Sequence, residues 1–263
     1  PTRRAGAKVV YFVDTYANYF DPQLGESLIA VLEHNAVTVY VHPAQKASGM
    51  AMISVGAVDA ARKQAAQNVR VLAEAVRQGY HIVTSEPSAA LALTREYPAL
   101  LDDDDDVRLV AENTSEACTY LWRMHRAGKL LLDFSPLHVT AGYHTPCHTK
   151  ALQVGTPAEQ LLRLIPGLRV QRLEAGCSGM AGTFGLKREN YRSSLRAGWG
   201  LITGLRQPGL HLGTTECSAC KMQMEQGTNK PTIHPLKLLA LSYGLQPELA
   251  PLVNRRGEEL IVT

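Results

Sequence analysis

An internal repeat is the feature of this 263-residue sequence that most constrains its fold. Three short motifs of the first half recur in the same order in the second half. The matched pairs are Phe12–Thr15 with His144–Cys147, Gln45–Met50 with Ala175–Met180, and Thr84–Ala90 with Thr214–Cys220. The spacing is also preserved, because 39 residues separate Ser48 from Pro87 and Ser178 from Cys217. We interpret the chain as a duplicated module.

The two copies differ in their cysteines. Four of the five cysteines of the chain lie in the second copy, at Cys147, Cys177, Cys217 and Cys220. The first copy carries Thr15, Ala47, Pro87 and Ala90 at the matching positions, and its Ser48 matches Ser178. One copy can therefore assemble a thiolate site and the other cannot.

Strand and helix patterns alternate along both copies. Short apolar or β-branched runs predict strands at residues 8–13, 37–41, 81–84, 139–143, 168–173 and 211–214. Helical spacing predicts helices at 24–32, 59–78, 88–95, 159–164, 187–205, 218–226 and 234–241, and a connecting helix at 107–128. This alternation predicts an α/β fold of two pseudo-symmetric, Rossmann-like halves, each a parallel sheet with flanking helices.

The repeat also sets the expected domain boundaries. We expect a first half at residues 1–100 without cysteine ligands, a helical connector at 101–138, a second half at 139–246 with the thiolate site, and a C-terminal tail at 247–263. Because the first residue is Pro1 rather than Met, we expect a processed chain or a piece of a longer one.

Composition argues against several classes of protein. A net charge of +3 with scattered charges is too weak to indicate nucleic-acid binding, and no apolar run reaches the roughly 18 residues of a membrane span. The acidic block Asp102–Asp106 lacks the alternating ligands and central glycine of a calcium loop, so we expect a solvated segment. The sequence opens with no signal-peptide pattern, and we expect a soluble intracellular protein.

The cysteines carry the strongest chemical signal. Cys217-Ser-Ala-Cys220 is a Cys-x-x-Cys pair at a predicted helix start, where the helix N-terminus favours thiolates. Each cysteine segment follows a predicted strand, and parallel strands end at one edge of a sheet, so three loops can bring the four thiols together. Such a set suits an iron–sulfur cluster or a zinc ion, and thiol–disulfide exchange through Cys217 and Cys220 is a third interpretation.

Other polar residues near these motifs are expected to be structural. His234 precedes Pro235 and is expected to cap or pack at a helix start, and Glu86 and Glu216 to stabilise helix N-termini. Cys118 lies apart from the other cysteines and is expected to be a small buried side chain. We expect Gly179, Gly182 and Gly185 to serve close backbone packing rather than a nucleotide.

The motifs resemble the cysteine-rich CCG domain family. The resemblance covers roughly residues 8–246, with the duplication, and rests on Pro146–His148, Cys177–Gly185 and Thr215–Cys220. The family has members in anaerobic glycerol-3-phosphate dehydrogenase, among the iron–sulfur subunits of glycolate and lactate oxidases, and in heterodisulfide reductase. The sequence most resembles the C-terminal region of fused FAD-binding and iron–sulfur oxidoreductases.

The resemblance implies an iron–sulfur cluster of the 4Fe-4S type, with zinc as the alternative metal. The implied ligands are Cys147, Cys177, Cys217 and Cys220, and the residues around them are Ser178, Gly179, His148 and Thr183. The paired cysteine of the family is Cys177-Ser178 here, so a fifth thiolate is missing and we expect no heterodisulfide chemistry.

The function implied by the resemblance is electron transfer for an FAD-linked dehydrogenase of glycerol 3-phosphate, lactate, glycolate or a related 2-hydroxyacid. Electrons would pass from flavin toward a quinone or another acceptor. The implied partners are an FAD-binding dehydrogenase module and a ferredoxin-like iron–sulfur module, on the same or a separate chain, with FAD only on the partner. We expect no catalytic residue in this chain, and a cytoplasmic location or one at the inner face of the membrane through a complex. The alternative is a zinc-stabilised interaction scaffold without a redox role.

Overall fold

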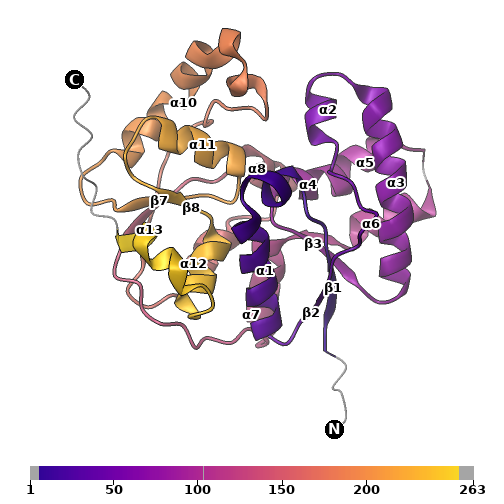
Figure 1. Cartoon of the computed structure of the whole chain (residues 1–263), viewed down its shortest axis with the longest axis horizontal. Helices are drawn as coiled ribbons and strands as arrows, with labels where there is room; N and C mark the ends of the chain where they lie inside the picture. Colours follow the sequence, from indigo (N-terminus) through magenta and orange to yellow (C-terminus); the bar gives the residue numbers. More distant parts are fainter. Residues whose placement is uncertain (1–5, 103, 255–263) are drawn as a thin grey trace. The chain divides into compact units, whose positions relative to one another are not determined.

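The computed structural model describes residues 6–102 and 104–254. The chain divides into two compact units between Leu131 and Leu132. Each unit contains one four-stranded sheet with helices around it (Figure 1). The position of Pro1, and of residues 255–263 of the expected tail, lies outside the described residues.

The sheet of the first unit is entirely parallel and has the strand order β2-β1-β3-β4. Its strands are β1 (Lys8–Tyr11), β2 (Thr38–Tyr40), β3 (His81–Thr84) and β4 (Thr114–Glu116). The inner strands β1 and β3 are apolar and buried over most of their length, whereas β2 lies at an edge and is largely exposed. This is the pattern that a parallel sheet covered by helices requires.

Helices follow the strands of the first unit in alternation. They are α1 (Pro22–His34), α2 (Met50–Ser54), α3 (Val58–Arg77), α4 (Pro87–Leu91), α5 (Tyr97–Leu100), α6 (Asp105–Glu112) and α7 (Ala117–Arg126), with the π-helical turns η1 (Tyr16–Phe20) and η2 (Ala92–Glu96). In α3 the buried residues Ala65, Val69 and Leu72 recur every three or four positions, which turns one side of the helix to the core.

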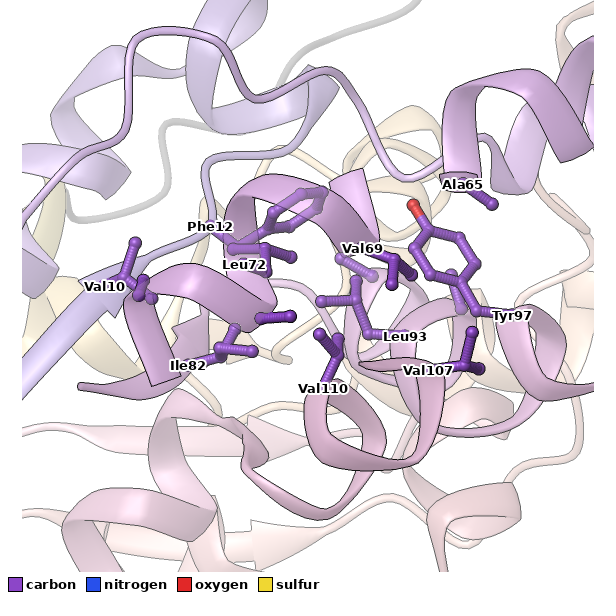
Figure 2. Close-up of a cluster of buried hydrophobic side chains, with 14 residues drawn as sticks. Val10, Phe12, Ala65, Val69, Leu72, Ile82, Leu93, Tyr97, Val107 and Val110 are labelled. Carbon is purple, nitrogen blue, oxygen red and sulfur yellow. The ribbon is translucent and has the colours of Figure 1, made fainter. Parts of the chain in front are cut away.

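The core of the first unit lies between α3, the sheet and the helices that follow β3. Figure 2 shows Val10 and Ile82 from the sheet, Leu72 from α3, and Leu93 and Tyr97 from the next helical turns converging in one cluster. All five are fully buried. Burial of each such side chain contributes about 1.5–3 kcal/mol, so this cluster holds the strand ends of the unit in place.

The second unit repeats the topology of the first. Its strands are β5 (Thr140–Tyr143), β6 (Arg169–Arg172), β7 (Leu212–Thr214) and β8 (Thr232–Ile233). Their order is β6-β5-β7-β8, and all are parallel. This is the order of the first sheet with four added to each strand number. The predicted α/β fold with two repeated halves is therefore confirmed.

The second unit has a corresponding set of helices. They are α8 (Cys147–Leu152), α9 (Pro157–Leu162), α10 (Tyr191–Leu205), α11 (Ser218–Gln226), α12 (Pro235–Ser242) and α13 (Ala250–Asn254), with the 3-10 turns η3 (Phe184–Leu186), η4 (Arg188–Asn190) and η5 (Pro247–Leu249). Across residues 6–102 and 104–254, no helix is both long and apolar enough to cross a membrane.

The prediction of a connecting helix at residues 107–128 is wrong. This segment forms α6, then β4, then α7, and Thr114–Glu116 pair in parallel with β3. The helix is interrupted because the Glu116 carboxylate accepts hydrogen bonds from the backbone N–H groups of Cys118 (2.8 Å) and Thr119 (2.9 Å) and so begins a new helix. The segment thus completes the first sheet, and the chain divides only after Leu131.

Candidate functional site

The cysteine segments of the second unit leave the ends of three adjacent strands. Cys147 begins α8 after β5, Cys177 lies in the loop after β6, and Cys217 is the N-cap of α11 after β7. Because β6, β5 and β7 are neighbours in a parallel sheet, their carboxyl ends lie at one edge. The fold itself therefore directs the three segments to the same place.

Electrostatic coupling and hydrogen bonds link the thiols. Burial raises the pKa of Cys147, and the nearby Cys177 and Cys217 raise it further. A hydrogen bond with the Cys220 side chain, followed by burial, raises the pKa of Cys217 well above its usual range. The Cys217 sulfur also accepts the backbone N–H of Cys220 at 3.5 Å. The structure thus brings the four predicted cysteines into one neighbourhood.

The site is open to solvent on one side and buried on the other. Cys147 and Cys177 are exposed, Cys217 is half-buried and Cys220 is buried. None of the four forms a disulfide, and neither does Cys118, which is buried in the first unit as expected. A group held here would be anchored in the protein at Cys220 and accessible beside Cys147 and Cys177.

Four thiols can hold either a single metal ion or an iron–sulfur cluster. Within residues 6–102 and 104–254, no three His, Cys, Asp or Glu side chains are grouped to hold one metal ion. A zinc site needs its four ligands about 2.0–2.3 Å from one point. An iron–sulfur cluster distributes its thiolates over several iron atoms, so its ligands can stand farther apart. Four thiols carried by three neighbouring loops could serve either kind of group.

Ser178 and Gly179 contact the sulfur atoms directly. The Ser178 hydroxyl, 2 % exposed, donates to the Cys220 sulfur at 3.2 Å. The backbone N–H of Gly179 donates to the Cys177 sulfur at 3.2 Å. Both bonds place a donor on a sulfur atom, and such donors favour a thiolate over a thiol.

Close packing of α10 fixes the loop that carries Cys177. Gly179 has a φ of +87°, and a Cβ there would lie 2.1 Å from the Ser194 carbonyl oxygen of α10. A Cβ on Gly198, one turn further along α10, would lie 2.1 Å from the Ser178 carbonyl oxygen. The Ser194 hydroxyl donates to the Gly179 carbonyl at 2.9 Å. The expectation that these loop glycines serve backbone packing is confirmed for Gly179.

The histidines beside Cys147 lie in different surroundings. His144 is 2 % exposed, and burial, aided by the charge of Lys150, lowers its pKa to about 4, so its ring is neutral at pH 7. His148 is partly exposed, and its backbone N–H is hydrogen-bonded to Cys147. Thr183 is partly exposed at the start of η3, and its hydroxyl bonds no cysteine of the described chain.

Sequence reasoning missed a buried pair next to Cys217. The Tyr143 hydroxyl donates to a carboxylate oxygen of Glu216 at 2.9 Å, and Glu216 is fully buried. The matching Tyr11 instead bonds Ser85 at 2.9 Å. The recurrence of a tyrosine at the end of the first strand of each copy was the available signal. The Tyr143–Glu216 hydrogen bond ties the end of β5 to the segment that carries Cys217.

His234 has the predicted capping role. Its Nδ1 accepts the backbone N–H of Leu236 at 3.1 Å, at the start of α12. Its Nε2 lies 3.1 Å from the Glu216 carbonyl oxygen. His234 therefore joins α12 to the segment that carries Cys217.

In the first unit, residues without sulfur occupy the positions that match the cysteine site. Ser48, the counterpart of Ser178, donates its hydroxyl to Asp14 at 2.8 Å, and its backbone N–H also donates to Asp14 at 2.9 Å. The Tyr97 hydroxyl donates to the Ser48 carbonyl at 3.0 Å. At the counterpart of Cys220 stands Ala90, which is 1 % exposed. In the first unit, hydrogen bonds to a carboxylate and from a phenol thus hold this loop. In the second unit, hydrogen bonds to cysteine sulfur atoms hold the matching loop.

Comparison with known proteins finds a family model and relatives that match the cysteine-bearing part of this chain. The model of the CCG cysteine-rich domain matches residues 141–225, which include all four cysteines of the site. A subunit of anaerobic glycerol-3-phosphate dehydrogenase from Escherichia coli K12 is 37% identical over 234 residues, 89% of this chain and 58% of that protein. Lactate utilization protein A from Geobacillus kaustophilus is 30% identical over 185 residues, 68% of this chain and 75% of that protein.

The chain therefore spans less than two thirds of the length of the glycerol-3-phosphate dehydrogenase polypeptide that it matches. Among solved structures, a hypothetical protein from Helicobacter pylori aligns with a TM-score of 0.56 at 14% identity, over 97% of this chain and 53% of that one. That likeness supports the fold alone. From the matched domain and the identity to relatives over most of this chain, we conclude that the chain belongs to the CCG cysteine-rich domain family.

Proposed function

We propose that the chain is an iron–sulfur electron-transfer module of an FAD-linked dehydrogenase. The observation that carries the proposal is the convergence of four free thiols at one sheet edge, in residues matched by the cysteine-rich domain model. Cys147, Cys177, Cys217 and Cys220 would hold the cluster, of the 4Fe-4S type. When bound, such a cluster supplies reversible one-electron transfer.

The residues around the thiols would support that role. Ser178 and Gly179 place hydrogen-bond donors on the Cys220 and Cys177 sulfurs, which stabilises negative charge there. The buried Cys220 would anchor the group, while Cys147 and Cys177 would leave one side accessible for exchange of electrons. Potentials of clusters respond to hydrogen bonding and solvent exposure, and these contacts would therefore tune the potential.

The relatives support the assignment to a dehydrogenase system. One is named as part of anaerobic glycerol-3-phosphate dehydrogenase and another as a lactate utilization protein. We assign oxidation of glycerol 3-phosphate or of a 2-hydroxyacid to a flavin-containing partner, with electrons leaving toward a quinone or another acceptor. A ferredoxin-like iron–sulfur module is the second proposed partner.

We propose a reducing, cytoplasmic compartment for this module, at the inner face of the membrane when it is part of a complex. All five cysteines are described and none of them forms a disulfide. Free thiols at exposed positions such as Cys147 and Cys177 persist where glutathione and thioredoxin keep them reduced.

Metal analysis of anaerobically purified protein tests the proposed function. We expect about four iron and four acid-labile sulfide per chain, the stoichiometry of a 4Fe-4S cluster. One zinc without sulfide would instead support the structural scaffold. A protein with neither metal, in which Cys217 and Cys220 form a disulfide on oxidation, would support thiol–disulfide exchange.

A further inference from the structure

An exposed apolar and basic surface lies directly after the cysteine loop of the second unit. Single exposed apolar side chains are ordinary, but here four of them fall within 16 residues. They are Phe184 (41 % exposed), Leu186 (56 %), Tyr191 (43 %) and Trp199 (55 %). The same segment contains the exposed cations Lys187, Arg188, Arg192 and Arg196. We call this set of eight side chains the α10 surface.

The helix presents the centre of this surface on one side. Arg192, Arg196 and Trp199 are spaced by four and three residues, so they lie along one stripe of α10. The Arg206 guanidinium, two turns further along the same stripe, lies 5.3 Å from the centre of the Trp199 ring. Trp199 is therefore a large, oriented aromatic group surrounded by positive charge, and Trp and Arg are the residues most often found at the energetic centres of interfaces.

The opposite side of the same helix touches the cysteine loop. Gly198 packs so closely on the Ser178 carbonyl that a Cβ would lie 2.1 Å from it, and Ser194 bonds the Gly179 carbonyl. Only the thickness of one helix, about 10 Å with its side chains, thus separates the α10 surface from the backbone next to Cys177. In Figure 1, α10 runs beside α11, whose N-cap is Cys217.

The positive charge of the α10 surface indicates a partner with a negatively charged contact face. Residues 184–199 contain four cations and one anion, Glu189, a net charge of +3, equal to the net charge of the whole chain. Neither Arg192 nor Arg196 forms an ion pair with a described residue, so both charges are available to a partner. Charges arranged in this way attract a surface of opposite sign and speed its association.

We propose that the α10 surface is the docking site for a redox protein or domain whose contact face is acidic around an apolar centre. This inference rests on the proposed function, because it assigns to one surface the delivery of electrons to the thiolate site. The partner would place its own redox group over α10, about one helix thickness from the backbone next to Cys177.

The apolar residues of α10 favour a protein over an anionic membrane. A helix that lies in a membrane interface offers a continuous apolar face. In α10 the apolar face, with Leu201, Ile202 and Leu205, is buried within the second unit. The exposed stripe alternates cations with one aromatic group, which is a pattern of protein interfaces.

Site-directed photocrosslinking in the native host tests the docking site. The full-length protein that carries this chain would receive benzoylphenylalanine at Trp199, with the exposed Tyr19 of the first unit as the control position. We expect crosslinks at position 199 to a flavin- or iron–sulfur-containing protein or domain, identified by mass spectrometry, at a peptide rich in Asp and Glu. Crosslinks to a second copy of the chain, to lipid, or to nothing would overturn the proposal.

Charge-reversal variants test the electrostatic basis. Arg192→Glu with Arg196→Glu should lower the crosslink yield at position 199 at least tenfold, and Arg192→Gln with Arg196→Gln at least threefold. The matched control reverses two exposed cations of α3, Lys63→Glu with Arg70→Glu, and should change the yield less than twofold. A yield unaffected by the α10 variants would contradict the proposal.

Metal content separates this inference from the proposed function. The α10 variants should keep the iron and sulfide content of the unmodified protein, since none of the changed residues contacts a cysteine. If the unmodified protein contains no iron, the proposed function fails. If iron is present in every variant while crosslinking is unchanged, only the docking site fails.

Discussion

The hydroxyl of Ser178 donates a 3.2 Å hydrogen bond to the sulfur of Cys220. In the first unit the corresponding hydroxyl, that of Ser48, donates instead to the Asp14 carboxylate. Both serines are 2 % exposed. The duplicated loop thus keeps a buried hydroxyl in each unit, and the acceptor is sulfur only in the unit that has cysteines.

This contact predicts the effect of Ser178→Ala on the redox potential. A donor on a ligand sulfur favours the reduced state, which carries more negative charge. One hydrogen bond contributes about 1 kcal/mol, or about 40 mV for one electron. We expect the potential of Ser178→Ala to fall by about that amount in an anaerobic redox titration, and Ser48→Ala to leave it unchanged. An equal shift in both variants would contradict the assignment.

Two glycines of α10 predict opposite effects on stability. A Cβ at Gly198 would lie 2.1 Å from the Ser178 carbonyl, whereas a Cβ at Gly200 meets nothing within 4 Å. Gly198→Ala should therefore destabilise the second unit by about 1–3 kcal/mol. Gly200→Ala should stabilise it by up to about 1 kcal/mol, since alanine is the better helix former. Urea unfolding of the two variants measures both; equal effects would show that α10 does not pack on the cysteine loop.

The half-buried His81 is expected to reduce stability in acid. Burial, followed by the charge of Arg123, lowers its pKa to about 4, from an ordinary value near 6.5. The folded unit therefore holds His81 neutral, while the unfolded chain takes up a proton below about pH 6.5. The stability of the first unit should be full above pH 6.5 and fall as the pH drops toward 4.

His81→Gln tests this pH dependence. Glutamine can keep a hydrogen bond to Ser115, which His81 contacts at 2.9 Å, but it cannot titrate. The fluorescence of Trp122, with Trp199 changed to Phe, follows unfolding of the first unit alone. We expect His81→Gln to lose less stability than the parent between pH 7 and pH 5. An unchanged pH slope would contradict the pKa of His81.

Cys118 provides a control for substitutions of the four site cysteines. It is fully buried in the first unit and belongs to α7, whereas the four site cysteines all lie in the second unit. Cys118→Ala should lower stability by about 1 kcal/mol or less through lost packing and leave iron and sulfide content unchanged. Loss of iron in this variant would show that iron binding does not depend on the predicted site.

Much of the fold follows from local sequence patterns. β3 and α11 have the boundaries predicted from the sequence. In β3 a β-branched run ends at a turn, and at α11 a Cys-x-x-Cys pair begins the helix. β4 was not predicted, since Thr114-Ser-Glu116 is polar and short. Its burial depends on pairing with β3 and on the Glu116 carboxylate capping α7, and neither is visible in a local pattern.

The cysteines of the candidate site could be predicted from the internal repeat. The spacing shared by Ser48–Pro87 and Ser178–Cys217 aligned the copies, so the cysteines stood out as the difference between them. The Tyr143–Glu216 pair was not predicted, because the partner of a buried carboxylate depends on which strands become neighbours. Side-chain hydrogen bonds across 42 residues, as between Ser178 and Cys220, likewise require the tertiary fold.

The proposed cluster site is tested by the iron and acid-labile sulfide content, together with the visible spectrum, of the anaerobically purified protein and of Cys217→Ala. We expect a brown protein with about four iron and four sulfide per chain, and loss of both in Cys217→Ala but not in Cys118→Ala. A colourless protein with one zinc and no sulfide would contradict it.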